Sequence, residues 1–299
     1  MANQIIKVAT TIEQQLDLLK HRGMNIGDED KAKENLLDIG YFRLGFYFFP
    51  FEVNYPQKDN RNHQYKEGTL FDNGVKLYYF DFDLRNILAR YLTRIEINFR
   101  TKIVYTVSNR YNQDPVWFVN SNIVTHKYVQ NFDKLVYTDT FKTESVIKQH
   151  HRHHSNDKYA PAWKTIEFMS FGAVIVLYRE LKDKILQLEI AKSYGFTSIK
   201  TFLVYLETVR FVRNCCAHGK VIFDLHLNSR IKSGPIRVTA QNASNLSGAI
   251  QVIRYMLGHI STNRVLELDE KLDKLLQNNK VPENVKTIIE QSSGLNIPK

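Results

Sequence analysis

Residues 71–111 have the sequence FDNGVKLYYFDFDLRNILARYLTRIEINFRTKIVYTVSNRY. Apolar residues recur at spacings of three, four and seven, as at Leu77, Leu84, Leu88 and Ile95, which is the period of an amphipathic helix. The outer faces carry the basic residues Arg85, Arg90, Arg94, Arg100 and Lys102. These 41 residues predict one long helix, and its length makes a helical fold the natural expectation for the chain.

The segments on both sides of this stretch have the same helical period. Thr11 and Asp28 are suitable N-caps for two short helices before it, and the aromatic block 41–51 is expected to form a short buried element. Further helices are expected over 126–149, 163–181, 183–194, 198–218, 242–261 and 264–277. The sequence therefore predicts an all-α fold, with at most a small β-hairpin near 221–238.

Three parts are expected along the chain. Residues 1–70 form an N-terminal helical and aromatic region packed on the main bundle, and 71–277 form the main helical domain. Residues 278–299 are polar and are expected to be a tail of frayed helix and loop. Residues 53–68 are polar and rich in turn-forming residues, which predicts an exposed loop or short hairpin.

Composition and charge restrict the class of protein. The 299 residues are 43% hydrophobic and 24% charged, so the chain is expected to fold without disulfides or metal. Cys215 and Cys216 are sequence neighbours, and the longest apolar run, 171–178, is far shorter than a bilayer span. We therefore expect a soluble, cytoplasmic protein that uses no membrane. The net charge of +10 makes nucleic acid the first partner to consider.

The stretch 199–218 carries the candidate site. At about 100° per residue, five apolar residues fall within about 40° of Arg213, so this arginine is predicted to lie on a buried stripe with Ile199, Phe202, Leu206, Val209 and Ala217. Arg210, Asn214 and His218 follow on one neighbouring arc, and Gly219 can cap the end of the helix. One helix thus brings together an arginine, an amide and an imidazole within about two turns.

Two interpretations of Arg213 remain open. A buried guanidinium needs an acidic partner or an anion, so it can form an internal salt bridge, for example with Glu96 or Glu167, while His218 only caps the helix. Alternatively, Arg213 holds a phosphate and His218 transfers protons. The spacing alone does not decide, because Arg254 and His259 repeat it without the asparagine.

The surroundings of the motif carry a resemblance. Four segments occur in order: IGYFRLGFYFFPF (39–51), RIE with Arg100 (94–100), Trp163 and Glu167 with SFG (163–172), and RNCCAH (213–218). Together they resemble the Abi family of bacterial abortive-infection proteins, of the AbiD/AbiF type, over residues 12–225. The last motif also resembles that of the HEPN superfamily of α-helical ribonucleases.

The resemblance implies a HEPN-like bundle and a metal-independent endoribonuclease that acts in bacterial phage defence, often as a toxin held by an antitoxin. It assigns the active site to Arg213, Asn214 and His218, with no cofactor. From charge and position, Arg210 and Lys220 are expected to bind flanking phosphates of the RNA. HEPN relatives pair around their motif, which implies a homodimer. The sequence after the histidine, GKVIFD (219–224), departs from the family pattern.

Two other functions remain open: a non-catalytic RNA-binding module that holds a structured RNA, and a protein-interaction component of a defence system. The RNA partner is expected to be the substrate, and an antitoxin RNA is a further candidate. The tract His150–His154 is predicted to be a solvated helix end, because no cysteine and no ordered ligand spacing accompany it. No metal site is therefore expected.

Overall fold

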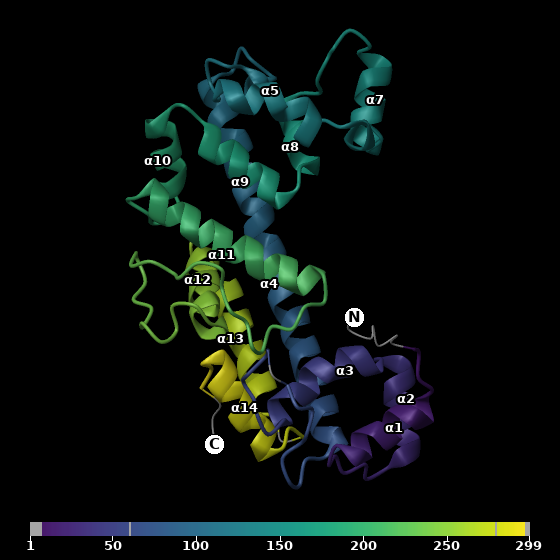
Figure 1. Cartoon of the computed structure of the whole chain (residues 1–299). Coiled ribbons are helices and arrows are strands. Elements are labelled where there is room, and N and C mark those ends of the chain that lie inside the picture. Colours follow the sequence, from purple (N-terminus) through teal and green to yellow (C-terminus); the bar gives the residue numbers. More distant parts are fainter. Residues whose placement is uncertain (1–7, 60, 279, 297–299) are drawn as a thin grey trace, which may run out of the picture. The chain divides into compact units, whose positions relative to one another are not determined.

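The computed structural model describes residues 8–59, 61–278 and 280–296. Within these ranges the regular structure is entirely helical, so the all-α prediction is confirmed (Figure 1). No helix in the described ranges is long and apolar enough to cross a membrane. The α-helices are α1 (Ile12–His21), α2 (Glu29–Asp38), α3 (Tyr41–Phe48), α4 (Phe71–Arg110), α5 (His126–Leu135), α6 (Asp139–Lys142), α7 (Ser145–His153), α8 (Ala162–Phe168), α9 (Phe171–Glu180), α10 (Lys184–Lys192), α11 (Ile199–Ala217), α12 (Leu246–Gly258), α13 (Thr262–Leu276) and α14 (Glu283–Ser293).

The chain divides into two compact units, each described separately below. One unit comprises the residues up to Arg85 and those from Asp273 onward, and the other comprises Asn86–Leu272. The boundary falls inside α4, which contributes residues to both units. The predicted division at residues 70 and 277 stays a prediction.

In the first unit, the predicted caps are confirmed. Thr11 forms a capping box with Gln14, and Asp28 accepts a hydrogen bond from the Lys31 amide. The aromatic block, by contrast, is only partly buried: Tyr47 and Phe48 lie in the core, whereas Phe42 is 82% exposed. The block folds as α3 followed by a buried 3₁₀ turn over Phe49–Phe51, and a helix such as α3 buries only one stripe of its surface.

The segment predicted as a tail contains the packed helix α14. Its Val285 and Ile289 are fully buried, and Tyr55 and Ser292 form a 3.0 Å hydrogen bond between their hydroxyl groups. The expectation of a frayed helix and loop is wrong for 283–293, because apolar residues at i and i+4 give this polar segment a narrow core-facing stripe. Residues 279 and 297–299 lie outside the described residues.

In the second unit, two of the predicted helices are interrupted. The segment 126–149 folds as α5, α6 and α7, because Thr138 caps a new helix start through the amide of Phe141. The segment 163–181 breaks between α8 and α9, where the Ser170 hydroxyl caps α9. This break leaves the carbonyl of Met169 outside a helix.

The small hairpin that the sequence allowed near 221–238 does not form, since the described residues of this segment contain no strand. Leu227 donates to the carbonyl of Ser244 at 2.8 Å, and Ile231 donates to that of Ala243 at 2.7 Å. Its apolar side chains, such as Ile222 and Phe223, are buried instead of pairing across strands. The segment is therefore an irregular loop tied to the start of α12.

Candidate active site

Helix α11 carries the Arg213–His218 motif and packs against α9, α10 and α12 (Figure 1). The Ser198 hydroxyl caps its start. At its end Gly219 has φ of +61°, the left-handed region that favours glycine. The Lys220 amide donates to the Cys215 carbonyl at 2.9 Å and that of Gly219 to Cys216 at 3.3 Å, which is a Schellman cap. The predicted cap at Gly219 is confirmed, and it fixes His218 as the residue at which the helix ends.

The predicted buried stripe of α11 is partly wrong. Phe202, Leu206 and Val209 are buried as expected, but Ala217 is exposed and the Arg213 side chain is 36% exposed. The first turns of α11 are covered by the helices packed around them, whereas its last turn emerges toward solvent. The motif therefore lies at the margin of the core.

Arg213 is held by an ion pair with α4. Its Nε donates to Oε2 of Glu96 at 3.0 Å, and the Glu96 side chain is 8% exposed. Oε1 of the same carboxylate accepts from Nη2 of Arg100 at 3.0 Å, and that Nη2 also donates to the Met169 carbonyl at 2.9 Å. The internal salt bridge to Glu96, which the sequence left open, is therefore present.

This ion pair does not neutralise the site. Two guanidinium groups share one carboxylate, which leaves a formal charge of +1. Nη1 of Arg213 also donates to Oδ1 of Asn214 at 3.3 Å, while Nη2 has no partner among the residues that the structure describes. A guanidinium has five N–H donors, so Arg213 retains donors and exposed surface with which to bind an anion.

His218 lies at the helix terminus, with an exposed side chain. Its backbone amide donates to the Asn214 carbonyl at 3.0 Å, but its imidazole has no hydrogen bond or ion pair within the described part of the chain. His218 lies five positions after Arg213, which corresponds to about 7.5 Å along the axis of an ideal helix and about 140° around it. The structure thus joins Arg213 to Asn214 by a hydrogen bond and shows no contact between either side chain and the His218 imidazole within the described residues.

The two predicted RNA-binding residues flank the motif. Nε of Arg210 donates to Glu207 at 2.6 Å, and the other oxygen of this carboxylate accepts from Arg179 of α9 at 2.8 Å. Lys220 follows the helix cap and is exposed. Arg179 and Arg210 therefore share the carboxylate of Glu207 beside the motif. Arg179 was not among the site residues that the sequence predicted.

A comparison with protein-family models matches residues 34–224 to a family described as Abi-like protein. The chain belongs to the Abi-like protein family. The matched region contains α4 and the whole of α11, and therefore both sides of the Glu96–Arg213 ion pair. Searches of curated proteins and of solved structures give no match. Membership in this family associates the chain with abortive infection, a form of phage defence.

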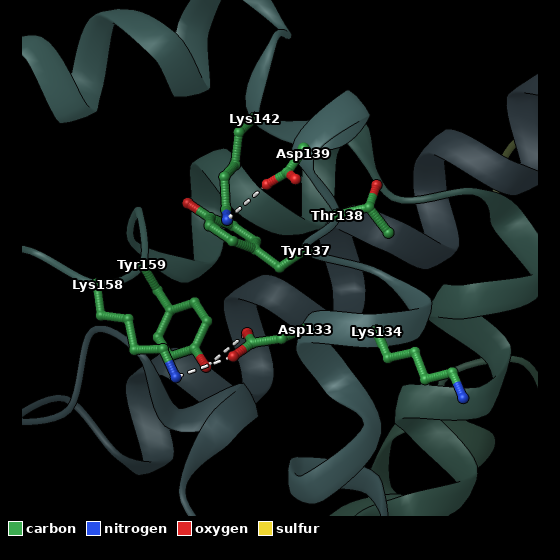
Figure 2. A pocket seen from close by; sticks show the side chains of 8 residues that line it. All are labelled: Asp133, Lys134, Tyr137, Thr138, Asp139, Lys142, Lys158 and Tyr159. Atoms are coloured by element: carbon green, nitrogen blue, oxygen red, sulfur yellow. Dashed lines mark hydrogen bonds and ion pairs between the residues drawn. The ribbon is translucent and has the colours of Figure 1, made fainter.

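Apart from the motif, this Abi-like protein has a polar hollow of about 490 Å³, which is lined by none of the motif residues. Figure 2 shows its charged groups satisfying one another: Lys158 and the Tyr159 hydroxyl both reach Asp133, and Lys142 reaches Asp139. Burial would raise the pKa of Asp133, but the hydrogen bonds from Lys158 and Tyr159 outweigh it and lower that pKa. Mutual pairing makes this hollow a weaker candidate than the motif.

The histidine tract differs from its prediction. It forms the end of α7, but His150 is 5% exposed and its Nε2 lies 3.2 Å from Asp157. Burial first, and then the neighbouring Lys164 and His154, lower the pKa of His150. A solvated helix end is thus wrong for His150, whose ring is buried and contacts the rings of His151 and His154. No group of three or more His, Cys, Asp or Glu in the described ranges could hold a metal ion.

Proposed function

We propose that this Abi-like protein is a metal-independent endoribonuclease whose site contains Arg213, Asn214 and His218. One observation carries the proposal: a partly exposed arginine, incompletely neutralised by Glu96, lies on the last turns of the helix that ends at an exposed histidine. Arginine suits phosphate binding through its fork of donors, and histidine is the side chain best suited to proton transfer near neutral pH.

The reaction needs no group beyond RNA and side chains. The 2′-oxygen attacks the adjacent phosphorus, the bond from phosphorus to the 5′-oxygen breaks, and the products are a 2′,3′-cyclic phosphate and a 5′-hydroxyl. His218 takes the proton from the 2′-hydroxyl or supplies one to the leaving oxygen. Such proton transfer contributes about 10²- to 10⁴-fold. Arg213 stabilises the added negative charge on the phosphate, and Asn214 orients its guanidinium.

A second copy of the chain would complete the site. Transesterification is helped by proton transfer at two oxygens, and one motif supplies a single histidine. Arg213 and His218 also lie about 140° apart on α11, so one copy does not direct both at the same phosphate. We propose a homodimer in which a two-fold axis brings two His218 residues into one cleft.

Family membership supports the biological setting of this proposal. A ribonuclease that stops translation during phage infection would protect neighbouring cells, and it would need restraint until then. We propose that an antitoxin, RNA or protein, covers the exposed surface around His218. This cytoplasmic toxin would then act only when the antitoxin is lost.

A non-catalytic RNA-binding module is the second candidate. The absence of an orienting hydrogen bond on the His218 imidazole, within the described residues, favours it, because an activated base is normally held by a third group. Such a module would bind RNA through the same arginines and leave the strand intact.

The deciding experiment incubates the purified chain with single-stranded RNA, with and without EDTA, and analyses the product ends. We expect cleavage that survives EDTA, ends in 2′,3′-cyclic phosphate and 5′-hydroxyl, and spares an all-deoxy strand. Cleavage of that DNA strand, or activity that EDTA abolishes and Mg²⁺ restores, would contradict the mechanism. Tight binding without cleavage would favour the second candidate.

A further inference from the structure

A long stretch of the second unit carries only positive charge. Residues 225–266 contain no Asp or Glu but five Arg or Lys. Three of the five, Arg230, Lys232 and Arg237, lie on the loop between α11 and α12. Positive charge without acidic neighbours produces a local potential that attracts polyanions.

The loop folds these charges into a cavity. Arg230, Lys232 and Arg237 line a hollow of about 900 Å³ together with Lys200, from the first turn of α11. None of the lining residues is acidic, and all four cationic residues are exposed. The positive charge of the cavity is therefore available to a ligand.

The loop that lines the cavity is anchored to its neighbours. Ile231, between two of the cations, is buried, and its amide donates to Ala243. At Gly234 an added Cβ would lie 2.9 Å from both Thr201 Cγ2 and the Tyr205 hydroxyl, so the loop rests directly against α11. The charges are thus presented by a fixed surface.

A groove of about 410 Å³ continues from the cavity along α11. Lys200 lines both hollows. The groove has an apolar floor that includes Leu203 and Phe211, and its one carboxylate, Glu207, is shared by Arg179 and Arg210. An apolar and aromatic floor between cations is the combination that binds bases and phosphates of a single strand.

The cavity and the groove form one strip along α11, and helix geometry places the motif on the same face as this strip. Lys200 and His218 are 18 residues apart, which is five turns at about 100° per residue, so they occupy the same face. Glu207, Phe211 and Asn214 fall within about 40° of that face. The strip from cavity to His218 is roughly 27 Å long at about 1.5 Å per residue.

We propose that single-stranded RNA binds along this strip, with its backbone anchored by Lys200, Arg230, Lys232 and Arg237 and its scissile phosphate at His218. This inference rests on the proposed ribonuclease activity and extends it to a second, non-catalytic contact surface. At about 3.4 Å per stacked nucleotide, the strip spans roughly eight nucleotides. Only longer RNAs engage both ends.

The first experiment measures binding of a labelled 20-nucleotide RNA by fluorescence anisotropy in the His218→Ala full-length chain, which prevents cleavage. The test variant adds Arg230→Gln, Lys232→Gln and Arg237→Gln. The matched control adds Lys127→Gln, Lys148→Gln and Arg152→Gln, three exposed cations on α5 and α7 that carry the same total charge.

We expect the test variant to bind about tenfold more weakly or worse and to lose about 2 from the slope of log affinity against log salt. We expect less than a twofold effect in the control. Equal weakening in both variants would show that net charge alone acts, and unchanged affinity would overturn the inference. Lys200→Gln tests the strip without touching the loop and should lower the slope by about 0.7.

The second experiment separates the strip from the active site. In the His218-containing chain, the triple loop variant should slow cleavage of the 20-nucleotide RNA and leave cleavage of a five-nucleotide RNA unchanged. Equal slowing of cleavage for the two RNA lengths would overturn the inference, while the proposed ribonuclease activity would still stand. Strip-dependent RNA binding without any cleavage would instead refute the proposed function alone. Binding to phosphatidylserine vesicles in preference to RNA would overturn the strip as an RNA surface.

Discussion

Helices α11 and α12 end in the same spacing, an arginine followed by a histidine five positions later. In α12, Arg254 forms a one-to-one ion pair with Asp269 at 2.5 Å. Nδ1 of His259 donates to the Tyr255 carbonyl at 3.0 Å, and its ring lies 4.5 Å from the Tyr255 ring. In α11, Arg213 shares its carboxylate with a second arginine, and the exposed His218 ring has no partner in the described chain.

The difference lies in what surrounds the two pairs. At α12 the arginine is neutralised and the imidazole is tied to its own helix, so both groups serve the fold. At α11 an excess positive charge remains, together with an exposed imidazole whose two nitrogens bind no other group within the described residues. A spacing of residues carries little information until the charge balance around it is known.

The strongest test of this comparison exchanges each histidine for alanine. We expect His218→Ala to lower RNA cleavage by about 10²- to 10⁴-fold, because it removes the proton-transfer group, and His259→Ala to leave cleavage within about twofold. Single-turnover assays on one labelled RNA measure both. Circular dichroism and thermal unfolding check that each variant is folded. Equal activity in His218→Ala and the parent would remove the assigned role.

The arginines provide the second test. We expect Arg213→Ala to lower cleavage by about 10²-fold, since one charge-stabilising donor is typically worth that much, while the fold survives because Arg100 still pairs with Glu96. Arg254→Ala should change stability by no more than about 1 kcal/mol, because its ion pair is more than a third exposed, and should not change cleavage.

The Arg213→Lys variant sharpens this result. Lysine keeps the charge but lacks the planar fork that bonds Glu96, Asn214 and a phosphate together, so we expect most of the activity to be lost. Global unfolding of Arg213→Ala, measured by urea titration, would instead assign Arg213 to the fold, as Arg254 is assigned here.

Sequence periodicity identified most of this fold because it reports local structure. The long helix α4, the caps at Thr11 and Asp28, and the end of α11 at Gly219 all depend on residues within a few positions of one another. The use of the Met169 carbonyl before Ser170 by Arg100 of α4, and the contact of α14 with Tyr55, join segments far apart in the sequence, and periodicity does not contain such contacts.

The same limit applied to the site. The sequence named Glu96 as one of two partners for Arg213, but only the structure shows Arg100 on the same carboxylate. The basic cavity was missed, although one signal was present: the absence of acidic residues from 225 to 266. The net charge of the whole chain does not show this local absence of acidic residues.

A third test concerns how the α11 terminus is held. Gly219 follows the C-cap His218 and has φ of +61°, whereas Ile260, which follows the C-cap His259 of α12, does not have a positive φ. We expect Gly219→Ala to cost about 1 kcal/mol of unfolding free energy and to lower cleavage several-fold, because the cap positions His218. The α12 terminus needs no such residue. Chemical denaturation with a parallel cleavage assay measures both effects, and a loss of stability without any change in cleavage would separate the cap from the site.

The last prediction, which has the smallest expected effect, concerns a third histidine, His150 of α7. Burial lowers the pKa of His150 in the folded chain below its ordinary value of about 6.5 in the unfolded chain. Between the folded and the unfolded pKa, the unfolded chain therefore binds more protons than the folded one. The free energy of unfolding consequently falls as the pH drops below about 6.5. Asp157 opposes this effect, while Lys164, His151 and His154 strengthen it. We expect His150→Gln to weaken the pH dependence of urea unfolding between pH 5 and 7. An identical pH dependence of stability in the parent and the variant would show that His150 does not titrate across folding.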